Sequence, residues 1–599
     1  MSDAERPRAG EPGSPSDLPL LKHGPPRLGN PAGPVPLVVG ITGHSNLLAA
    51  EIPRIRELVQ QFFLELSALS PYLPLTLMSG LAEGADRLVA AEALALGINL
   101  VVVLPMSREL YMSDFQSPES RQEFATLCDR GEVVQLPLLP GMTEQDVATN
   151  NEARNRQYAQ LGVFLCAHCH VLLALWDGKP SQRLGGTAQV IGFHHHDVMP
   201  GFTPVRKRVR DLIVDDESDL VFHIVVSRNE ANGSPQAPLA PLDCAWLTTD
   251  EAKPRTPSLP VRYQLIFARI ADFNADSIRH AAVIARDRRD LHGIDRNLAG
   301  EPLAAINQLF VISDWLAGHY QRQFHMLLRC THTLAVLMGL AYISYADIFD
   351  DPLYIFVFLC LFTAGLVFVG IASRRAWHRK YLDYRALAEG LRIQYFWAIG
   401  GVRREEVTKF AHDNFLQKQD VELGWIRNVM RVAGLYTDVV IPERIAGLQM
   451  AIDNWIGDEN NGQISYYARK SRHLSSLQSR TEFISMTCLS VGIFLALGLL
   501  IYHSELSASA RTPLKVLMAI LPLIAASRDA YSQKKAEKEL VKQYRFMHRV
   551  FQNARRQLAI ATSDEERRQI LRAVGEAALD EHAEWILMHR ERPLELSKL

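Results

Sequence analysis

Four short segments of the chain combine glycines with hydroxyl, imidazole or carboxylate side chains, a combination suited to binding a phosphate-bearing molecule. They are residues 40–44 (GITGH), 79–86 (SGLAEGAD), 176–178 (WDG) and 184–187 (LGGT). Glycine lets the backbone approach a ligand closely, and backbone N–H groups at the start of a helix attract phosphate. A nucleotide is therefore the natural occupant of a site built from these segments.

The elements expected to position these segments are strands and helices in alternation. Strands are predicted in five apolar runs, at residues 35–43, 75–80, 99–105, 170–178 and 219–227. Amphipathic helices are predicted between them, at residues 51–69, 81–97 and 151–165. Apolar strands that alternate with helices indicate a parallel sheet covered on both faces, and the loops that follow such strands converge on one crevice.

Two familiar phosphate-binding motifs are absent, since no G-x-G-x-x-G follows the first strand and no G-x-x-x-x-G-K-[ST] occurs. The ordered set VGITGH, MSGLAEGAD, Arg154-Asn155 with Tyr158, LALWDG and GGT nevertheless resembles the SLOG superfamily, over about residues 35–230. This resemblance implies a Rossmann-like fold that binds a nucleotide-derived ligand. His44 is a further candidate, because a histidine beside a glycine turn can contact a phosphate. The residues that the resemblance assigns to ligand binding are Thr42, Gly43, Ser79, Gly80, Gly84, Asp86, Arg154, Asn155, Asp177, Gly178, Gly186 and Thr187. 

One position separates binding from catalysis. LOG-type nucleotide phosphoribohydrolases of this superfamily carry a PGGxGTxxE element with a catalytic glutamate, and Val190 stands at that position here. A valine cannot act as a general base. We therefore expect a receptor rather than an enzyme, with no metal and no cofactor beyond a nucleotide-type ligand. The alternative, a membrane-tethered nucleotide hydrolase or NAD-consuming enzyme, would have to use Glu83 or Asp86.

Within the same crevice, N–H groups at the start of the helix after Ser79 could hold a phosphate, and the Ser79 hydroxyl is expected to cap that helix.

Cys166, Cys169 and His170 spell the C-x-x-C-H of haem attachment. Because the two thiols fall where a helix runs into an apolar strand, burial as small apolar residues is expected instead. Zinc binding with the histidines at 194–196 lacks a second ligand pair at normal spacing, and these histidines are expected in a solvated loop.

The composition argues against nucleic acid as a partner. The 599 residues include 64 Lys and Arg and 66 Asp and Glu, a net charge of −2, so there is no strongly basic field. Seven scattered cysteines and the lack of an apolar signal segment indicate a reducing compartment. Residues 1–34 are rich in Pro, Gly and Ser and are expected to form a disordered tail.

Beyond Val261 the sequence predicts long helices, and four segments within them are apolar enough for a bilayer. Residues 330–346, 353–373 and 483–502 carry no Asp, Glu, Lys or Arg, whereas 513–527 is shorter and includes Lys515. A hydrocarbon core of ~30 Å needs about 20 helical residues, so two transmembrane hairpins are expected.

The flanks of these segments indicate their orientation. The stretches 319–329, 373–385, 469–480 and 527–538 are basic, and the turn at 347–352 is acidic. The positive-inside rule then places both hairpin tips outside an inner membrane, with the soluble domains and both termini in the cytoplasm. The hairpins and the aromatic, basic helices after them resemble the SLATT group of two-span effector domains found with SLOG domains.

The expected fold class is an α/β Rossmann-like parallel sheet domain followed by an all-α region with about four transmembrane helices. The two resemblances imply a homo-oligomeric sensor and effector of anti-phage defence, in which a nucleotide-derived signal triggers membrane perturbation or pore formation. A structural membrane scaffold that binds no nucleotide is a third class. The expected regions are 1–34 (tail), 35–230 (nucleotide-binding domain), 231–260 (linker), 261–329 (helical connector), 330–373 (first hairpin), 374–482 (cytoplasmic helices), 483–527 (second hairpin) and 528–599 (C-terminal helices).

Overall fold

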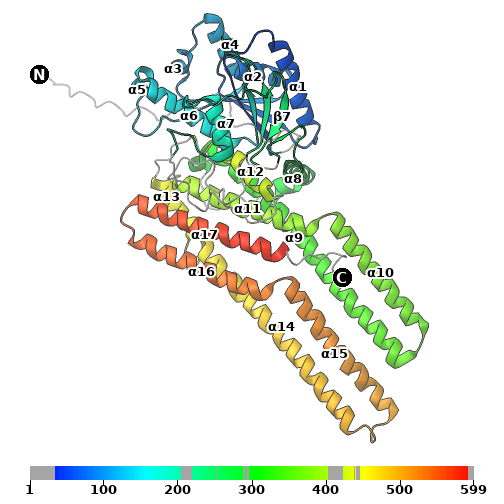
Figure 1. Cartoon of the computed structure of the whole chain (residues 1–599). Coiled ribbons are helices and arrows are strands. Elements are labelled where there is room, and N and C mark those ends of the chain that lie inside the picture. The colour runs from blue at the N-terminus through cyan, green and yellow to red at the C-terminus, as the bar shows by residue number, and fades with distance from the viewer. Residues whose placement is uncertain are drawn as a thin grey trace, which may run out of the picture.

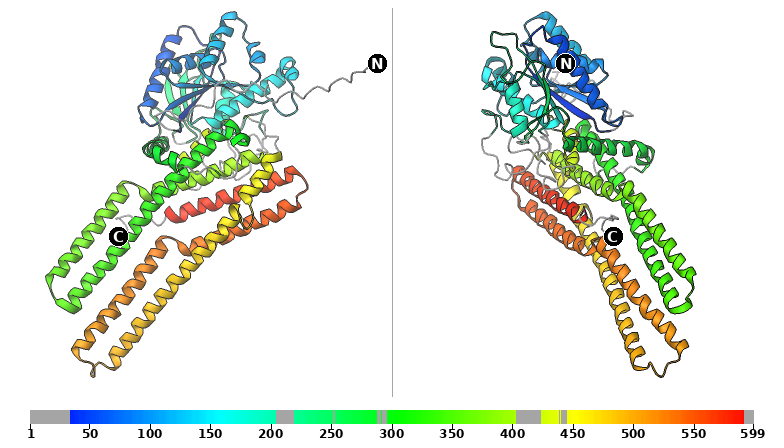
Figure 2. Two further views of the ribbon diagram at one scale, coloured as in Figure 1. Left: turned by 180° about the vertical axis from the view of Figure 1, so that it is seen from behind. Right: turned by 45° about the vertical axis from the view of Figure 1, so that its right-hand side comes forward.

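The α/β domain of the chain sits at one end of a long helical region that finishes in two hairpins (Figure 1). The computed structural model describes residues 34–203, 219–250, 253–287, 291, 296–402, 423–437, 439 and 445–590. The two hairpins project side by side from the same side of the helical body in all three views (Figures 1 and 2). The expected fold class is therefore confirmed: an α/β domain with a mostly parallel sheet, followed by helices that include four candidate membrane spans.

The α/β domain is built on one sheet with the order β4-β3-β2-β1-β5-β6-β7-β8. Neighbours from β4 to β6 are parallel, and β7 and β8 add antiparallel strands at one edge. The chain winds outward from β1 in one direction and from β5 in the other, which makes the β1/β5 boundary the switch point of a doubly wound sheet. The strands are β1 (Leu37–Gly43), β2 (Leu75–Ser79), β3 (Asn99–Leu104), β4 (Glu132–Gln135), β5 (Val171–Trp176), β6 (Val221–Val225), β7 (Cys244–Leu247) and β8 (Arg255–Thr256).

Helices cover both faces of this sheet. Successive residues of β5 enter opposite cores, with Leu173 and Leu175 in one and Leu172 and Ala174 in the other. This is why the strand is apolar at every position and shows no alternation with polar residues. The helices of the domain are α1 (Ile52–Ser67), α2 (Ala85–Ala95), α3 (Arg108–Met112), α4 (Pro118–Arg130), α5 (Glu144–Thr149), α6 (Asn151–His168) and α7 (Thr187–His196).

The segment 231–260, expected to be a linker, instead completes the sheet. Within it, β7 pairs with β6 and β8 pairs with β7. Trp246 of β7 is 4% exposed and packs on Phe62 and Phe222, whose rings are stacked 4.6 Å apart. Burial of these aromatic rings stabilises a strand that is too short and too close to prolines for its sequence pattern to predict.

The helical region begins at α8 and contains two hairpins of long helices. In the first hairpin α9 and α10 are joined through the π-helical turn η1 (Tyr345–Phe349), and in the second α14 leads into α15. A further π-helical turn, η3 (Ile452–Ile456), precedes α14. The helices are α8 (Val261–Arg286), α9 (Arg296–Ser344), α10 (Pro352–Arg374), α11 (Trp377–Gly400), α12 (Gly424–Ala433), α13 (Ile445–Ala451), α14 (Gly462–Ile501), α15 (Ala508–Lys534), α16 (Glu537–Ile560) and α17 (Asp564–Arg590).

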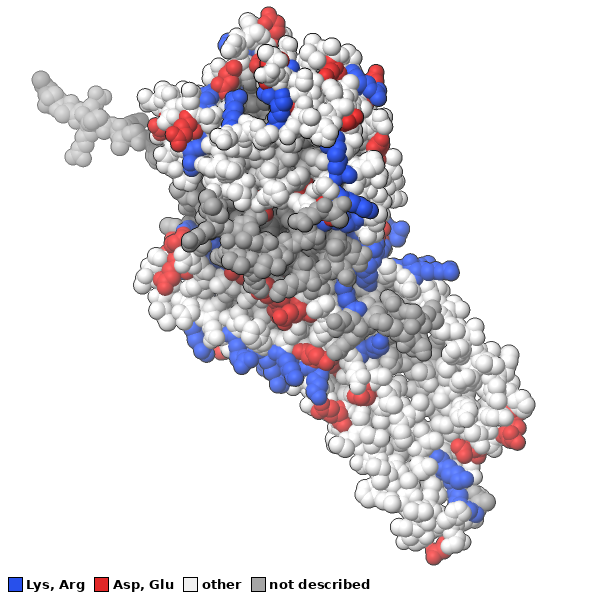
Figure 3. All heavy atoms as spheres, in the orientation of Figure 1, with Lys and Arg blue, Asp and Glu red and all other residues white. Residues whose placement is uncertain are grey.

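Four helices among the described residues are long and apolar enough to cross a membrane. Only 6–17% of their most apolar windows is buried inside the protein. Large side chains such as Phe356, Phe483 and Phe494 are 64%, 73% and 74% exposed. In Figure 3 the hairpins are almost free of charged side chains between their bases and their tips. Exposed apolar surface on this scale is unfavourable in water and favourable in a bilayer, so the chain has the character of a multi-pass membrane protein.

Each hairpin returns to the helical body through one residue, and these two residues have the same unusual backbone conformation. After α10, Ala376 adopts the left-handed conformation (φ 51°, ψ 37°), and after α15, Ala536 does the same (φ 52°, ψ 35°). Each alanine follows two basic residues and precedes a Tyr-Arg pair, at Tyr384 and at Tyr544, by eight positions. The shared pattern [RK]-[RK]-A-x₇-Y-R and the shared geometry indicate that the two hairpin units repeat one structural design.

Helix α8 joins the α/β domain to the hairpins. The side-chain amide of Asn274, which is fully buried, donates to the carbonyl oxygens of Val35 (2.8 Å) and Tyr72 (2.7 Å) beside the amino ends of β1 and β2. Two residues further, Asp276 lies 2.6 Å from Lys380 Nζ and accepts a hydrogen bond of 2.7 Å from the Tyr384 hydroxyl, both on α11.

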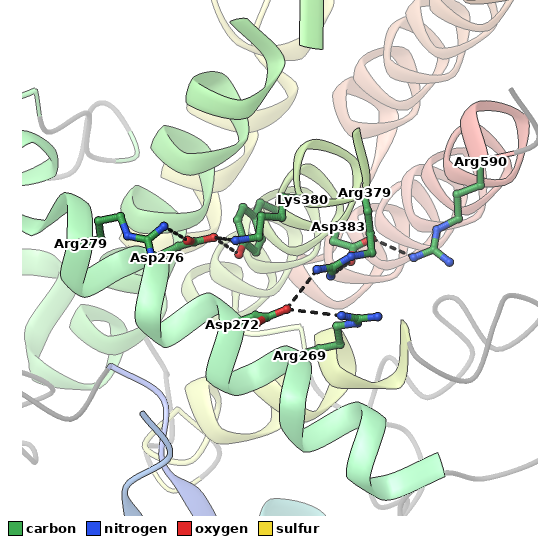
Figure 4. A network of polar contacts seen from close by, with 9 residues as sticks. Arg269, Asp272, Asp276, Arg279, Arg379, Lys380, Asp383 and Arg590 are labelled. Atoms are coloured by element: carbon green, nitrogen blue, oxygen red, sulfur yellow. Dashed lines mark hydrogen bonds and ion pairs between the residues drawn. The ribbon is translucent and has the colours of Figure 1, made fainter. Parts of the chain in front are cut away.

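The ion-pair network around Asp276 extends across α11 to the last helix (Figure 4). Asp272 of α8 pairs with Arg379 of α11 (3.1 Å), which also pairs with Asp383 (3.2 Å). Arg590 at the end of α17 reaches the other oxygen of Asp383 (2.9 Å). Since Asp276 and Asp383 are each 1% exposed, both carboxylates depend on these cations for stability.

We expect Asp276→Asn to lower the melting temperature of the full-length protein clearly, and Asp272→Asn to change it little. Removing one partner of a buried ion pair costs about 3–5 kcal/mol, whereas an exposed pair is worth about 1 kcal/mol or less. Asp272 is the matched control, because it lies on the same helix and pairs with the same neighbour helix but is 43% exposed. Thermal unfolding in one detergent checks both variants; equal losses would contradict the importance of burial at Asp276.

Candidate functional site

The segments predicted to bind a ligand gather at the carboxyl edge of the parallel strands. A Cβ atom added to Gly43 would lie 2.4 Å from Cβ of Ala85, and one added to Gly84 would lie 2.2 Å from the Ser45 carbonyl oxygen. The Ala85 N–H donates to the His44 carbonyl oxygen (3.1 Å). The loops after β1 and β2 are thus in direct contact, and the glycines make that approach possible.

The other predicted segments meet around α6. A Cβ added to Gly80 would lie 2.7 Å from Cδ2 of Leu161, and one added to Gly185 would lie 3.1 Å from Cβ of Tyr158. Gly185 has a φ of +72°, which an L side chain rarely adopts. The segments containing Ser79-Gly80 and Gly186-Thr187 therefore both contact α6 near its middle, at Leu161 and Tyr158, and Arg154-Asn155 lies one turn before Tyr158 on the same helix.

A charged cluster lies at the switch point between β1 and β5. His44 Nε2 lies 3.1 Å from Asp177 Oδ1, and Arg228 Nε pairs with Asp177 Oδ2 (2.8 Å). Burial would raise the pKa of the Asp177 carboxyl, but the Lys179 N–H, His44 and Arg228 together lower it below its ordinary value. Burial lowers the pKa of His44 in spite of the adjacent Asp177 carboxylate. At neutral pH the cluster therefore holds a carboxylate, a guanidinium and a neutral imidazole.

Arg228 was missed by the sequence analysis. It follows directly on the fifth predicted strand, so a basic residue at a strand's carboxyl end was the available signal. The segment that begins there also covers part of the crevice. Gly178 has a φ of +81°, a Cβ added to it would lie 2.5 Å from Leu239 Cδ1, and the Gln236 N–H donates to the Asp177 carbonyl oxygen (2.8 Å).

Asp86 is a buried carboxyl near the Ser79-Gly80 turn. It is 7% exposed, and burial raises its pKa to about 7, with a smaller opposing effect from the Ala82 N–H and from Arg87. The Tyr111 hydroxyl donates to the Gly80 carbonyl oxygen (3.0 Å) close by. A carboxyl that exchanges a proton near neutral pH is chemically competent as a general acid or base.

Ser79 was expected to cap the helix that follows it, but in the structure it does not cap α2. Its hydroxyl accepts from the Leu81 N–H (3.0 Å), and α2 begins only at Ala85, where Gly84 is the N-cap residue and provides no side-chain cap. The four residues between Gly80 and Ala85 form a turn, so the Ser79 hydroxyl stabilises that turn instead.

Arg154 is engaged by protein groups. Its guanidinium donates to the carbonyl oxygens of Leu110 (2.8 Å) and Val147 (3.1 Å) and pairs with Asp114 (2.8 Å). The Tyr158 hydroxyl donates to the same Asp114 carboxylate. Arg154 therefore holds the loop after α3 in place.

Three polar side chains at this edge make no hydrogen bond to any residue in the described part of the chain: Thr42, Asn155 and Thr187. Thr42 is the last residue but one of β1, and Asn155 lies in the second turn of α6. Thr187 opens α7, whose N-cap Gly186 provides no side-chain cap. The first N–H groups of a helix have no partner in the preceding turn, and those of Thr187 and Ala188 bond to no residue in the described part of the chain, whereas that of Gln189 donates to the Gly186 carbonyl oxygen. The start of α7 therefore presents a hydroxyl and two N–H groups, as an anion site requires.

The thiols of the C-x-x-C-H segment are buried, as expected: Cys166 is fully buried and Cys169 is 1% exposed. His170 Nδ1 accepts from the Val38 N–H (2.8 Å). The histidines at 194–196, expected in a solvated loop, form the last turn of α7, and His194 is fully buried there. Among the described residues, no group of three or more His, Cys, Asp or Glu is placed to hold a metal ion.

The fold defines a class of protein: a doubly wound, mostly parallel α/β domain carried by a helical region with four helices that could span a membrane. No family model, curated protein or solved structure matches the chain. The resemblance to SLOG and SLATT domains therefore rests on the sequence motifs alone.

Asp86→Asn should flatten the dependence of stability on pH between about 5 and 8. The pKa of the Asp86 carboxyl is higher in the folded state than in the unfolded chain. Its contribution to stability is therefore fully present at pH values below the unfolded pKa, and it is lost as the pH rises through about 7. The wild type should therefore lose more melting temperature over this range than the variant. Asp129→Asn, at a side chain that is 73% exposed, is the control and should follow the wild type. Parallel slopes for the wild type and Asp86→Asn would contradict the assignment.

Proposed function

We propose that the chain is a membrane-anchored receptor and effector, in which a nucleotide-derived ligand binds the α/β domain and alters the packing of the membrane helices. The observation that carries this proposal is the direct connection made by α8. Asn274 donates to the carbonyl oxygen of Val35, just before β1 of the sheet, and Asp276, on the same helix, pairs with Lys380 of α11. Between α10 and α11 stand only Arg375 and Ala376, so a movement of α8 reaches a candidate membrane span through one helix.

The location of the ligand is supported by the gathering of the SLOG-like segments at one edge of the sheet. Thr187 with the start of α7 suits a phosphate, and the Asn155 amide and Thr42 hydroxyl suit polar groups of a sugar or base. To move a two-state equilibrium from 1:99 to 99:1, the ligand must favour one state by about 5.5 kcal/mol. Several phosphate and base contacts made in one state only would supply this difference.

The consequence for the membrane is proposed from the SLATT resemblance: perturbation of an inner membrane, or formation of a pore, in anti-phage defence. The basic flanks support a cytoplasmic α/β domain. Oligomerisation is supported by the hairpin surfaces, since a Cβ added to Gly370 or Gly498 would meet no described atom within 4 Å. Such positions allow close approach of helices from another copy.

A membrane-tethered enzyme is the second candidate, and Asp86 is the observation that favours it. With a pKa of about 7, this carboxyl could transfer a proton to or from a bound nucleotide. Glu83, the other carboxylate that could replace the missing glutamate, accepts a hydrogen bond from the Ser120 hydroxyl. Val190, which stands at the position of the catalytic glutamate of LOG-type hydrolases, is 3% exposed and packs in the core.

The double variant Asn155→Ala, Thr187→Val should weaken nucleotide binding about tenfold or more, because each lost hydrogen bond is worth about 1 kcal/mol. Binding is measured on the full-length protein in lipid nanodiscs with radiolabelled ATP, NAD and ADP-ribose. The same variant, induced in cells, should insert in the membrane normally but no longer depolarise it.

The matched control is Gln61→Ala, Thr126→Val, which removes the same kinds of group from exposed helix positions of the same domain. Chromatography of the bound nucleotide separates the two candidates: intact ligand supports a receptor, and base release that Asp86→Asn abolishes supports the enzyme. Undiminished depolarisation by the double variant would refute the sensing mechanism.

A further inference from the structure

A half-open cavity of about 910 Å³ lies between the bases of the two hairpins. Its walls come from α9, α10, α14, α15 and α16. Thr331 stands at the start of the first apolar segment, Glu482 directly precedes the third, and Asp529 follows the fourth. The cavity is therefore at the level where the apolar helices end, which in a bilayer is the level of the lipid headgroups.

The polar lining of this cavity carries both signs of charge. Lys534 and Lys538 contribute two ammonium groups, and Glu482, Asp529 and Glu539 contribute three carboxylates. A purely anionic ligand would face the carboxylates, and a purely cationic ligand would face the lysines. A zwitterion that has a phosphate and an ammonium group can pair with both sets.

The remaining lining decides which kind of zwitterion fits. Recognition of a quaternary ammonium group uses a cage of aromatic rings. Among the described residues that line the cavity there is no Phe, Tyr or Trp, whereas Thr331 and Gln478 offer oxygen atoms that accept hydrogen bonds. This lining suits a primary ammonium group, which has N–H bonds to donate.

We propose that the cavity binds the headgroup of a single phospholipid that carries a phosphate and a primary ammonium group. The two lysines pair with the phosphate, and the carboxylates at the ends of the apolar segments accept hydrogen bonds from the ammonium group. Small-molecule sites span ~300–1,000 Å³, so the cavity has room for a headgroup and the first part of its acyl chains.

The acyl chains have an apolar path out of the cavity. Ala335 of α9 and Val369 of α10 line it on the side of the spans. Further along the spans the hairpins touch, since a Cβ added to Gly339 would lie 2.4 Å from Cδ2 of Leu523. A lipid in this position contacts both hairpins and stabilises their relative packing. The proposal depends on the hairpins spanning a bilayer and is independent of any ligand of the α/β domain.

The test uses the full-length protein in nanodiscs whose lipid is phosphatidylethanolamine, phosphatidylcholine or phosphatidylglycerol, with retained lipid measured by native mass spectrometry. Phosphatidylethanolamine should be retained about tenfold more than either of the others. Lys534→Gln, Lys538→Gln should lower this retention about tenfold, and Lys534→Arg, Lys538→Arg should preserve most of it. Asp529→Asn, Glu482→Gln should abolish the preference over phosphatidylcholine.

Lys542→Gln, an exposed lysine on α16 outside the cavity, is the matched control and should behave as the wild type. Equal retention of the three lipids, or retention unchanged by the lysine and carboxylate variants, would overturn the site. Glycerophosphoethanolamine, which has the same headgroup without acyl chains, distinguishes a membrane lipid from a soluble ligand: displacement of the lipid at comparable concentration would overturn the assignment to a lipid.

Discussion

The buried ion pairs between α8 and α11 are the interaction on which the arrangement of the whole chain depends. Asp276 is almost completely removed from water, and its charge is stabilised by Lys380, by the Tyr384 hydroxyl and by Arg279 of its own helix. If α8 slid or rotated by itself, it would leave an uncompensated charge in the interior. The α/β domain and the first hairpin are therefore constrained to move as one unit unless the network itself is broken.

At the carboxyl edge of the sheet, the glycines of the predicted ligand-binding segments are used for packing. Gly43, Gly84 and Gly185, which the sequence associates with a ligand, make room for other parts of the protein. Their close contacts bring the loops together, whereas the hydroxyl of Thr187 and the amide of Asn155 make no hydrogen bond to any described residue. The same segments thus contain residues that pack against the protein and residues whose polar groups have no partner in the described part of the chain.

The sequence predicts those parts of the structure that follow from periodicity and apolar length. The five strands β1, β2, β3, β5 and β6 and all four apolar helices follow from such signals, because each has a signal within a single segment. The outer strands β4, β7 and β8 were missed; β7 is stabilised by Trp246 packing on rings that are distant in sequence. Arg228 and the engagement of Arg154 were missed for the same reason, because their partners are defined only by the fold. The repeated pattern that ends in Tyr384 and Tyr544 could have been found by comparing the chain with itself.

Ala376 and Ala536, which adopt the left-handed backbone conformation, each connect a hairpin to a long helix that can act as a lever arm. Helices α11 and α16, which start directly after these alanines, have 24 residues each, a length of ~36 Å at 1.5 Å per residue. A tilt of about 10° about the far end of such an arm displaces the alanine at its start, and the hairpin base with it, by ~6 Å, roughly one helical turn. Since the arms are equally long and join their hairpins through the same backbone conformation, matched tilts would shift both hairpin bases by equal amounts. The bilayer would then experience a paired displacement of its four helices rather than the bending of one.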